Sequence, residues 1–375
     1  MNTEYTKHSI LRIAKRYKNA KRSYLLVNPL QAKHIPVKPS DALNMMRTLG
    51  NKLKEKHPTA NLVIGFAETA TAIGAAIADT YGENCKYIHT TRENYPSEDN
   101  VEFKEEHSHA VEQQLLTSDL KQYIDETDTV ILVDDELSTG KTLLNIIDVL
   151  KDKFTTLSTK KIVVASIMNR LSDDNMKRLS DADIECEYLL KLPEEDYDSQ
   201  VNEITVNAPE DVCGCSDMIS NYIVIETENE FSNPRKAISI KQYINDCRLV
   251  ISEIVAQLSF SATDKVLVLG TEEFMYPALL LGQALESVTN TVKCHSTTRS
   301  PIGVIDNNNY PIYCGYKLHS FYDDLRDTYI YDIEKYDKVL VVSDTKYDCT
   351  KAINCLANIL WKKGNNDIYF IKGAK

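Results

Sequence analysis

The chain has 375 residues, of which 43% are hydrophobic and 26% charged, an ordinary globular composition long enough for two domains of about 150 residues each. Its formal net charge of −12 argues against broad electrostatic binding of nucleic acid or of an anionic membrane. No apolar run approaches the ~20 residues of a membrane span, and the first residues lack the apolar core of a signal peptide. Nine cysteines without a pairing framework favour a reducing cytosol, so we expect a cytoplasmic protein.

Hydrophobic periodicity predicts alternating strands and helices in the first half of the chain. Strands are expected over residues 22–28, 61–64, 85–89, 130–133, 161–168 and 185–191, and helices over 41–55, 70–79 and 143–150. Residues 31–39 contain two prolines and predict a loop or an edge strand. Strands that alternate with helices imply an α/β fold with a mostly parallel sheet and right-handed crossovers.

The most informative segment follows the strand expected at residues 130–133. Three acids, Asp134, Asp135 and Glu136, precede a run of small and polar residues, which consists of Ser138, Thr139, Gly140, Lys141 and Thr142. In such a strand-loop-helix, backbone N–H groups and the helix N-terminus bind an anion, while the carboxylates can bind hydroxyls or a metal. The segment therefore predicts a sugar-phosphate site, with an ordinary strand-to-helix turn as the alternative. A Walker A loop fits less well, because Asp135 stands where its first glycine would be.

This segment resembles the signature of type I phosphoribosyltransferases, which bind phosphoribosyl pyrophosphate. The resemblance implies that Asp134 and Asp135 hold the ribose hydroxyls and that residues 138–142 surround the 5′-phosphate. The family often ends this loop with Thr-Gly-Gly, and here Lys141 replaces the second glycine. The resemblance also implies Mg²⁺ as cofactor, held mainly by the substrate, with Asp134 or Asp135 as a protein ligand.

Two further loops match the order of pyrophosphate-binding loops in the same family. The loop after the strand at 61–64 can offer backbone amides to pyrophosphate, and Glu68 in it either reaches a metal or ribose hydroxyl or caps the next helix. In the loop after the strand at 85–89, the guanidinium of Arg92 suits phosphate oxygens, although a solvated loop explains it equally well. The candidates from these loops are Ala67, Glu68, Thr69, Thr91, Arg92 and His107, with His109 a weaker one. Lys33, His34 and Lys38 belong either to a hood over the base or to plain surface.

The composition changes over residues 192–235, which become acidic and then rich in Asn, Ser, Pro and Cys. We therefore predict a phosphoribosyltransferase-like domain over 1–210, a linker over 211–235 and a second α/β domain over 236–375. A strand is expected at 222–225. Cys213 and Cys215 form the only close cysteine pair, and whether they bind a metal stays open.

The second half repeats features of the first at offsets between 205 and 212 residues. Gly65 matches Gly270, the Thr-Thr-Arg at 90–92 matches that at 297–299, and the acidic segment after 130 matches the one after 339. The order and near-constant spacing suggest an internal duplication. The second copy has Ser343 in place of Asp134 and Cys349 in place of Gly140, and Tyr347 and Asp348 would crowd and repel a 5′-phosphate. It is therefore not expected to bind phosphoribosyl pyrophosphate in the same way.

Residues 298–301 read Thr-Arg-Ser-Pro. Together with the Asp-Asp-Glu-x-Ser-Thr-Gly-Lys-Thr loop, this motif resembles a bacterial family in which a phosphoribosyltransferase-like domain precedes a TRSP domain. The resemblance implies an association with tellurite-resistance and stress-response gene clusters and a role in making a nucleoside-like metabolite. Arg299 and His319 are candidates to line a second pocket, or else they stabilise a loop.

From these features we expect an enzyme, a phosphoribosyltransferase of the glycosyltransferase class. It would use phosphoribosyl pyrophosphate and Mg²⁺ on a base-like nitrogen acceptor, or run the reverse phosphorolysis. The alternative is a non-catalytic protein that senses phosphoribosyl pyrophosphate or a nucleotide. The expected partners are small molecules, without membrane or bulk nucleic acid, and a homodimer stays open.

Overall fold

The computed structural model describes residues 4–18, 22–103, 113–213, 221–307, 309–346 and 349–373. Contacts divide the chain into two compact units. The first unit consists of Leu43–Glu194 and Ser232–Asn245, and the second of Met1–Ala42, Glu195–Phe231 and Asp246–Lys375. Each unit combines segments that are distant in sequence, unlike the consecutive domains expected from composition.

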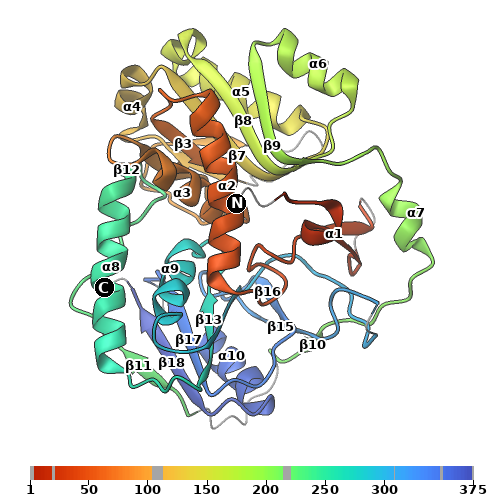
Figure 1. Cartoon of the computed structure of the whole chain (residues 1–375), viewed down its shortest axis with the longest axis vertical. Helices are drawn as coiled ribbons and strands as arrows, with labels where there is room; N and C mark the ends of the chain where they lie inside the picture. Colours follow the sequence, from red (N-terminus) through yellow and green to blue (C-terminus); the bar gives the residue numbers. More distant parts are fainter. Residues whose placement is uncertain are drawn as a thin grey trace. The chain divides into compact units, whose positions relative to one another are not determined.

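The first unit contains a six-stranded sheet in the order β12-β4-β3-β7-β8-β9, in which only β12 is antiparallel to its neighbour. Figure 1 shows β7, β8 and β9 side by side. Its strands are β3 (Leu62–Gly65), β4 (Lys86–His89), β7 (Thr129–Leu137), β8 (Lys161–Asn169), β9 (Ile184–Lys191) and β12 (Ile238–Ser239), with a separate hairpin of β5 (Asn100–Phe103) and β6 (Gln113–Leu116). The helices are α2 (Pro39–Lys56), which starts in the second unit, α3 (Ala70–Tyr81), α4 (Leu120–Glu126), α5 (Lys141–Lys153), the 3₁₀ helix η1 (Thr155–Thr159) and α6 (Asp173–Asp181).

The two faces of this sheet bury different helices. Alternate residues of β3 and β7 pack with the apolar stripe of α5 and with the β5–β6 hairpin in one core. Helix α3 is buried from Ala70 to Ala78 and packs against β3, β4 and β7. It approaches β3 closely, because a Cβ on Gly74 would lie 3.1 Å from the Cα of Gly65. This approach holds the loop between β3 and α3 at the edge of the sheet.

Most of the predicted elements of the first half are confirmed, and two of the differences lie near the candidate site. The strand expected at 130–133 continues to Leu137, so its acids belong to the strand. Hydrogen bonding to β8 extends it, because β8 is a buried strand that reaches Asn169. The β5–β6 hairpin was not expected, since each of its strands has only four residues and the pairing joins distant segments.

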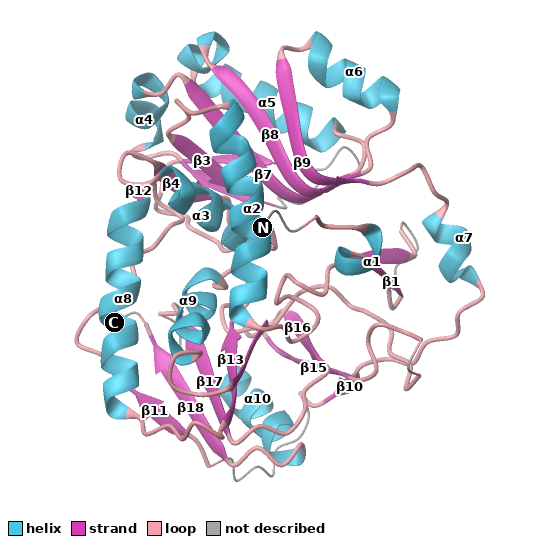
Figure 2. Ribbon diagram, in the orientation of Figure 1, coloured by secondary structure: helices cyan, strands magenta, loops and turns pink. Residues whose placement is uncertain are grey.

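The second unit contains a five-stranded, fully parallel sheet in the order β11-β18-β17-β13-β14, shown as neighbouring arrows in Figure 2. Its strands are β11 (Ile223–Ile225), β13 (Lys265–Gly270), β14 (Thr291–Ser296), β17 (Lys338–Ser343) and β18 (Asp367–Lys372). Two smaller sheets join β10 (Glu210–Asp211), β15 (Gly315–His319) and β16 (Asp327–Tyr331), and β1 (Arg12–Lys15) with β2 (Tyr24–Val27). The helices are α1 (Lys7–Ile10), α7 (Tyr197–Asn202), α8 (Ile240–Gln257), which starts in the first unit, α9 (Tyr276–Leu285) and α10 (Thr350–Lys362).

The two sheets repeat one topology, which supports the internal duplication. The order β4-β3-β7-β8 in the first unit corresponds to β14-β13-β17-β18 in the second. The register agrees as well, since Gly65 lies opposite Val133 and Gly270 opposite Val342. A hairpin follows the second strand of each copy. The second unit is therefore a second α/β domain built on the same plan.

The N-terminal segment packs within the second unit. The Lys33 side chain is 1% exposed, and its Nζ donates to the backbone oxygens of Glu272 at 2.8 Å and Thr297 at 3.1 Å. His34 is also buried, whereas the Nζ of Lys38 lies 3.8 Å from the carboxylate of Glu286 with most of its side chain exposed. The surface interpretation is therefore wrong for Lys33 and His34, because hydrogen bonding to backbone oxygens allows the lysine to be buried.

Among the described residues, all eight cysteines are free thiols. In that same part of the chain, no helix combines the length and apolarity needed to cross a bilayer. The predicted cytoplasmic location stays a prediction.

Candidate active site

The candidate site lies at the carboxyl ends of β3, β4 and β7. The chain order reverses between β3 and β7, which are neighbours in the sheet although β4 lies between them in sequence. Pairing on the β3 side ends at Val133, whereas pairing on the β8 side continues to Leu137. The last residues of β7 therefore extend beyond β3. Parallel α/β sheets bind ligands at such a switch point.

The predicted acid pair occupies this extension. The side chains of Asp134 and Asp135 are partly buried, and the backbone N–H of Asp135 donates to Oδ1 of Asp134 at 2.9 Å. Burial raises the pKa of Asp134 well above its usual range, and the charges of Asp135 and Glu136 add to the effect. A cation or a hydroxyl donor bound here would therefore relieve an unfavourable concentration of negative charge.

The third acid has a partner that the sequence did not reveal. Oε1 of Glu136 lies 2.6 Å from Nη1 of Arg170, and both side chains are less than one-fifth exposed, at 11% and 15%. Arg170 directly follows β8, and its backbone N–H donates to the oxygen of Leu137 at 2.8 Å. This ion pair holds the Glu136 carboxylate beside the end of β8. Glu136 is therefore not counted with Asp134 and Asp135 as a residue that binds the ligand.

The phosphate loop has the geometry of an anion site. Gly140 is the N-cap of α5 and has a φ of +74°, the left-handed region that favours glycine. Helix α5 begins at Lys141, where the backbone is helical, so the family's second glycine is replaced at a position that needs no special φ. Ser138, Thr139, Lys141 and Thr142 are exposed, and the first N–H groups of α5 have no intrahelical acceptor. The loop can therefore donate several N–H groups to one phosphate.

The two predicted pyrophosphate loops are joined by hydrogen bonds. The N–H of Ala67 donates to Oγ1 of Thr90 at 2.8 Å, and that hydroxyl donates to Oε1 of Gln113 at 2.6 Å. The N–H of Phe66 donates to the oxygen of Val133 at 2.9 Å, which joins the same loop to β7. This bond joins the residue before Ala67 to the residue before Asp134.

Side chains around these loops differ in exposure. Glu68 is 8% exposed, and the peptide bond before it is cis. Thr69 is the N-cap residue of α3 but makes no side-chain capping bond. Thr91 is fully buried and pairs with Gln114, whereas Arg92 is exposed. An exposed guanidinium beside a rigid loop suits contact with a soluble anion.

One further side chain at this edge was missed by sequence reasoning. Arg235 is 2% exposed, and its Nε donates to Oγ1 of Thr91 at 3.3 Å. It comes from the end of the segment predicted as linker, and the residues from Ser232 onward belong to the first unit. Nothing local in the sequence marks it, because its role depends on a contact across 144 residues. His107 lies outside the described residues, as does His109.

Comparisons with known proteins identify both halves. Residues 10–192 match the model of a family described as phosphoribosyl transferase, and residues 234–360 match the TRSP domain that occurs C-terminal to it. The chain belongs to this phosphoribosyltransferase–TRSP family. Its first domain is of the phosphoribosyltransferase type, and the protein is an enzyme of that glycosyltransferase class.

Solved structures of low similarity accompany these matches. The adenine phosphoribosyltransferase of Giardia lamblia in complex with 9-deazaadenine is 16% identical, with 50% of this chain and 96% of that chain covered and a TM-score of 0.37. The enzymes from Rhodothermus marinus (14% identical, 50% and 96% covered, TM-score 0.36) and Trypanosoma brucei (13%, 48% and 76%, 0.35) are comparable. A search of curated proteins gave no match. The family models therefore carry the assignment.

In the TRSP domain, the arginine of the Thr-Arg-Ser-Pro motif contacts a buried carboxylate. Nε of Arg299 lies 3.0 Å from Oε2 of Glu272, which also lies 3.2 Å from Nη1 of Arg326. Ser320 donates to the other oxygen of Glu272 at 2.5 Å. Glu272 corresponds to Ala67 of the phosphoribosyltransferase domain, at the offset of 205 that relates Gly65 to Gly270. An internal carboxylate therefore binds the arginine that corresponds to Arg92.

Other positions of the TRSP domain also differ from the phosphoribosyltransferase site. Asp344, the counterpart of Asp135, accepts a hydrogen bond of 2.6 Å from the hydroxyl of Tyr322. Tyr347 and Asp348 lie outside the described residues. His319 ends β15 and does not join the Glu272 contacts described above; it lies beside Cys213 and Cys355. Arg299 and His319 thus belong to two different clusters.

Proposed function

We propose that the phosphoribosyltransferase domain transfers the 5-phosphoribosyl group from phosphoribosyl pyrophosphate to a ring nitrogen of a base-like acceptor. The observation that carries the proposal is the pair Asp134 and Asp135 at the overhanging end of β7, followed by the left-handed Gly140 at the start of α5. Carboxylates at one end and N–H groups without intrahelical acceptors at the other suit a molecule with hydroxyls at one side and a phosphate at the other. The product would be a nucleotide-like precursor of a nucleoside-like metabolite, and the same site would support the reverse phosphorolysis.

Binding would rest on charge and hydrogen bonding. The N–H groups at the start of α5 and the hydroxyls of Ser138, Thr139 and Thr142 would bind the 5′-phosphate. Asp134 and Asp135 would accept hydrogen bonds from the ribose hydroxyls, which fixes the ring. Ala67 to Thr69 and the exposed Arg92 would bind the pyrophosphate group.

Catalysis would need no covalent nucleophile. The bond between C1 of the ribose and the pyrophosphate oxygen breaks, the acceptor nitrogen forms a new bond to C1, and the acceptor's proton leaves to solvent or to a nearby base. Positive charge develops on the ribose ring in that step, and carboxylates held beside the ring stabilise it. The protein would accelerate the reaction mainly by holding both reactants in line.

Mg²⁺ fits this donor set. Carboxylate oxygens are the ligands that Mg²⁺ prefers, and it usually binds through one or two carboxylates together with substrate phosphates. Asp134 and Asp135 would hold it, and the raised pKa of Asp134 indicates a place where a cation would be welcome. The ion would supply charge neutralisation of the pyrophosphate.

The decisive experiment measures pyrophosphate release from phosphoribosyl pyrophosphate and Mg²⁺ with a panel of purine, pyrimidine and related bases. We expect release with at least one base, abolished by the double variant Asp134→Asn/Asp135→Asn. Asp344→Asn provides a matched control, because it changes the corresponding residue of the TRSP domain. Loss of release in that control as well would contradict the assignment to the first domain.

The alternative function is a sensor that binds phosphoribosyl pyrophosphate without turnover. Titration calorimetry with the same ligand separates the two functions. Tight, Mg²⁺-dependent binding without release for any base would favour the sensor, whereas absence of Mg²⁺-dependent binding would refute both.

A further inference from the structure

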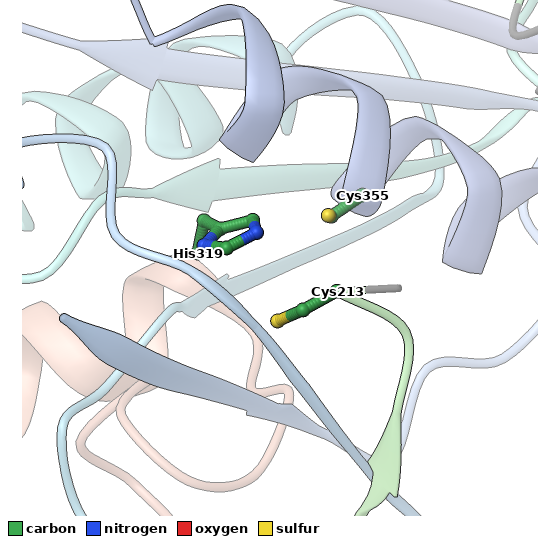
Figure 3. Close-up of side chains that lie close together, drawn as sticks. All are labelled: Cys213, His319 and Cys355. Carbon is green, nitrogen blue, oxygen red and sulfur yellow. The ribbon is translucent and has the colours of Figure 1, made fainter. Parts of the chain in front are cut away.

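Three side chains of types that bind metals meet in the second unit. Figure 3 shows Cys213, His319 and Cys355 with the imidazole ring and both sulfurs turned toward one common point. The two Sγ atoms and a ring nitrogen all lie within 4.8 Å of one another. We propose that these three residues bind a zinc ion that fastens the segment around β10 to β15 and α10.

The backbone explains why the three residues meet. Strand β10 pairs in parallel with β15, with Asp211 opposite Lys317, so the same register brings Cys213 beside His319. The N–H of Val212 donates to the oxygen of Lys317 at 3.2 Å, which continues the pairing past β10. Helix α10 supplies Cys355, whose Sγ lies 3.8 Å from the oxygen of Val212. Three segments distant in sequence thus place one ligand each.

The donor chemistry favours zinc. Two thiols and an imidazole form a soft to borderline donor set that selects Zn²⁺ over Mg²⁺ or Ca²⁺. In a tetrahedral zinc site the ligand atoms are about 3.5–3.8 Å apart, given Zn–S bonds of about 2.3 Å and Zn–N bonds of about 2.0 Å. The separations in the cluster, at most 4.8 Å, therefore exceed these spacings by no more than about 1.3 Å. A fourth position remains for water or another ligand.

One cationic and two acidic side chains lie beside β10 and β15 near the cluster. Lys317 pairs with Asp211 at 3.0 Å and with Asp327 at 3.1 Å. Burial raises the pKa of the Cys213 thiol to about 12, and the charge of Asp211 and the proximity of Cys355 contribute. A divalent cation would offset the thiolate charge on binding.

The duplication offers an internal comparison for Cys355. Helices α5 and α10 begin at Lys141 and Thr350, an offset of 209 residues, and at this offset Ile146 corresponds to Cys355. Ile146 is buried in the apolar core of the first unit. Cys355 is likewise buried in the apolar core of its unit, but there the thiol also lies beside Cys213 and His319.

The test uses the full-length protein, purified with reduced thiols and without a histidine tag. Metal analysis after dialysis against a weak chelator should give close to one zinc per chain. Cobalt substitution should produce a thiolate-to-metal charge-transfer band. The variants Cys213→Ser and His319→Gln should lose the zinc, whereas Cys314→Ser should keep it, because Cys314 is a partly buried thiol of the same unit outside the cluster. The Cys213→Ser variant suits this purpose because its side chain is only partly buried.

Limited proteolysis tests whether the zinc ion holds the segment around β10 to β15 and α10. Removal of zinc with a strong chelator should increase the rate of proteolytic cleavage near residues 205–213 at least tenfold, and added zinc should restore protection. Absence of zinc from the reduced protein, equal zinc in Cys213→Ser, or a disulfide between Cys213 and Cys355 in the purified protein would overturn the site. Zinc that binds without affecting cleavage would overturn the fastening.

Discussion

The variant Gly140→Ala should weaken phosphate binding more than it lowers the free energy of unfolding. The φ of Gly140 is +74°, and an added Cβ would lie 3.2 Å from Cδ2 of Leu171. A left-handed conformation costs a non-glycine residue roughly 1–2 kcal/mol. Alanine also lowers the conformational entropy of the unfolded chain, which stabilises the folded state by about 0.4–1 kcal/mol. Gly140→Ala should therefore destabilise the phosphoribosyltransferase domain by only about 1 kcal/mol.

The effect on ligand binding should be larger than the effect on stability. Relief of the strain at position 140 moves the N–H groups that begin α5, and these are the groups proposed to bind the 5′-phosphate. We expect Gly140→Ala to weaken binding of phosphoribosyl pyrophosphate at least about tenfold, or ~1.4 kcal/mol, measured by titration calorimetry with Mg²⁺. Gly140→Asn should lose less stability, because asparagine adopts this conformation more readily.

Gly82 provides the matched control within the same unit. It has a φ of +83° and a ψ of −150° at the end of α3, and no atom lies within 4 Å of an added Cβ. Gly82→Ala should therefore cost about 1–3 kcal/mol of stability through strain alone and leave affinity unchanged. Denaturant unfolding and calorimetry on both variants decide the matter. Equal affinity of wild type and Gly140→Ala would refute the phosphate-loop assignment, and so would an equal loss in both variants.

Three further predictions concern the loops and the charges. Thr90→Val should reduce pyrophosphate release at least about tenfold, because it removes the hydrogen bond that holds the N–H of Ala67 in the pyrophosphate loop. The corresponding Thr297→Val removes the equivalent bond to Glu272 and should not reduce release. Equal losses in both variants would contradict the assignment. Arg170→Met should destabilise the first unit by about 1–3 kcal/mol in denaturant unfolding, and adding Glu136→Gln should recover part of it; a double variant no more stable than the single one would argue against the ion pair. Burial raises the pKa of Asp332 from 3.8 to about 7. Between these two pH values the folded second unit therefore binds more protons than the unfolded chain. Its free energy of unfolding should fall as the pH rises from about 4 to about 7. Asp332→Asn should remove that slope, at most about 1.4 kcal/mol per pH unit, and an unchanged slope across urea titrations at several pH values would exclude this residue as its source.

The acid pair and phosphate loop could be predicted because their signal is local. Strand β7, the acids, Gly140 and helix α5 are contiguous, so periodicity and residue type define strand, loop and helix without tertiary information. The duplication was also readable, because repeated motifs keep their spacing. The conformation of Gly140 then explains why Lys141 is acceptable in place of a second glycine.

Other features depended on contacts between distant segments, which local patterns do not encode. The placement of Arg235 against Thr91 depends on the end of the predicted linker, where the oxygen of Pro234 accepts a hydrogen bond of 3.0 Å from the N–H of His89 in β4. Burial of Lys33 depends on backbone oxygens more than 200 residues away. Hydrogen-bond partners of this kind follow from sheet register and chain crossings.

The same distinction applies to function. The sequence by itself determined that one loop carries acids and an anion site, because those properties belong to neighbouring residues. Only the tertiary structure decided that Thr90 is joined to Ala67, that Glu272 binds Arg299 in the TRSP domain, and that Cys213 and His319 meet Cys355. These arrangements arise where parallel strands end at one edge or where a helix crosses a strand, and that geometry exists only after the chain has folded.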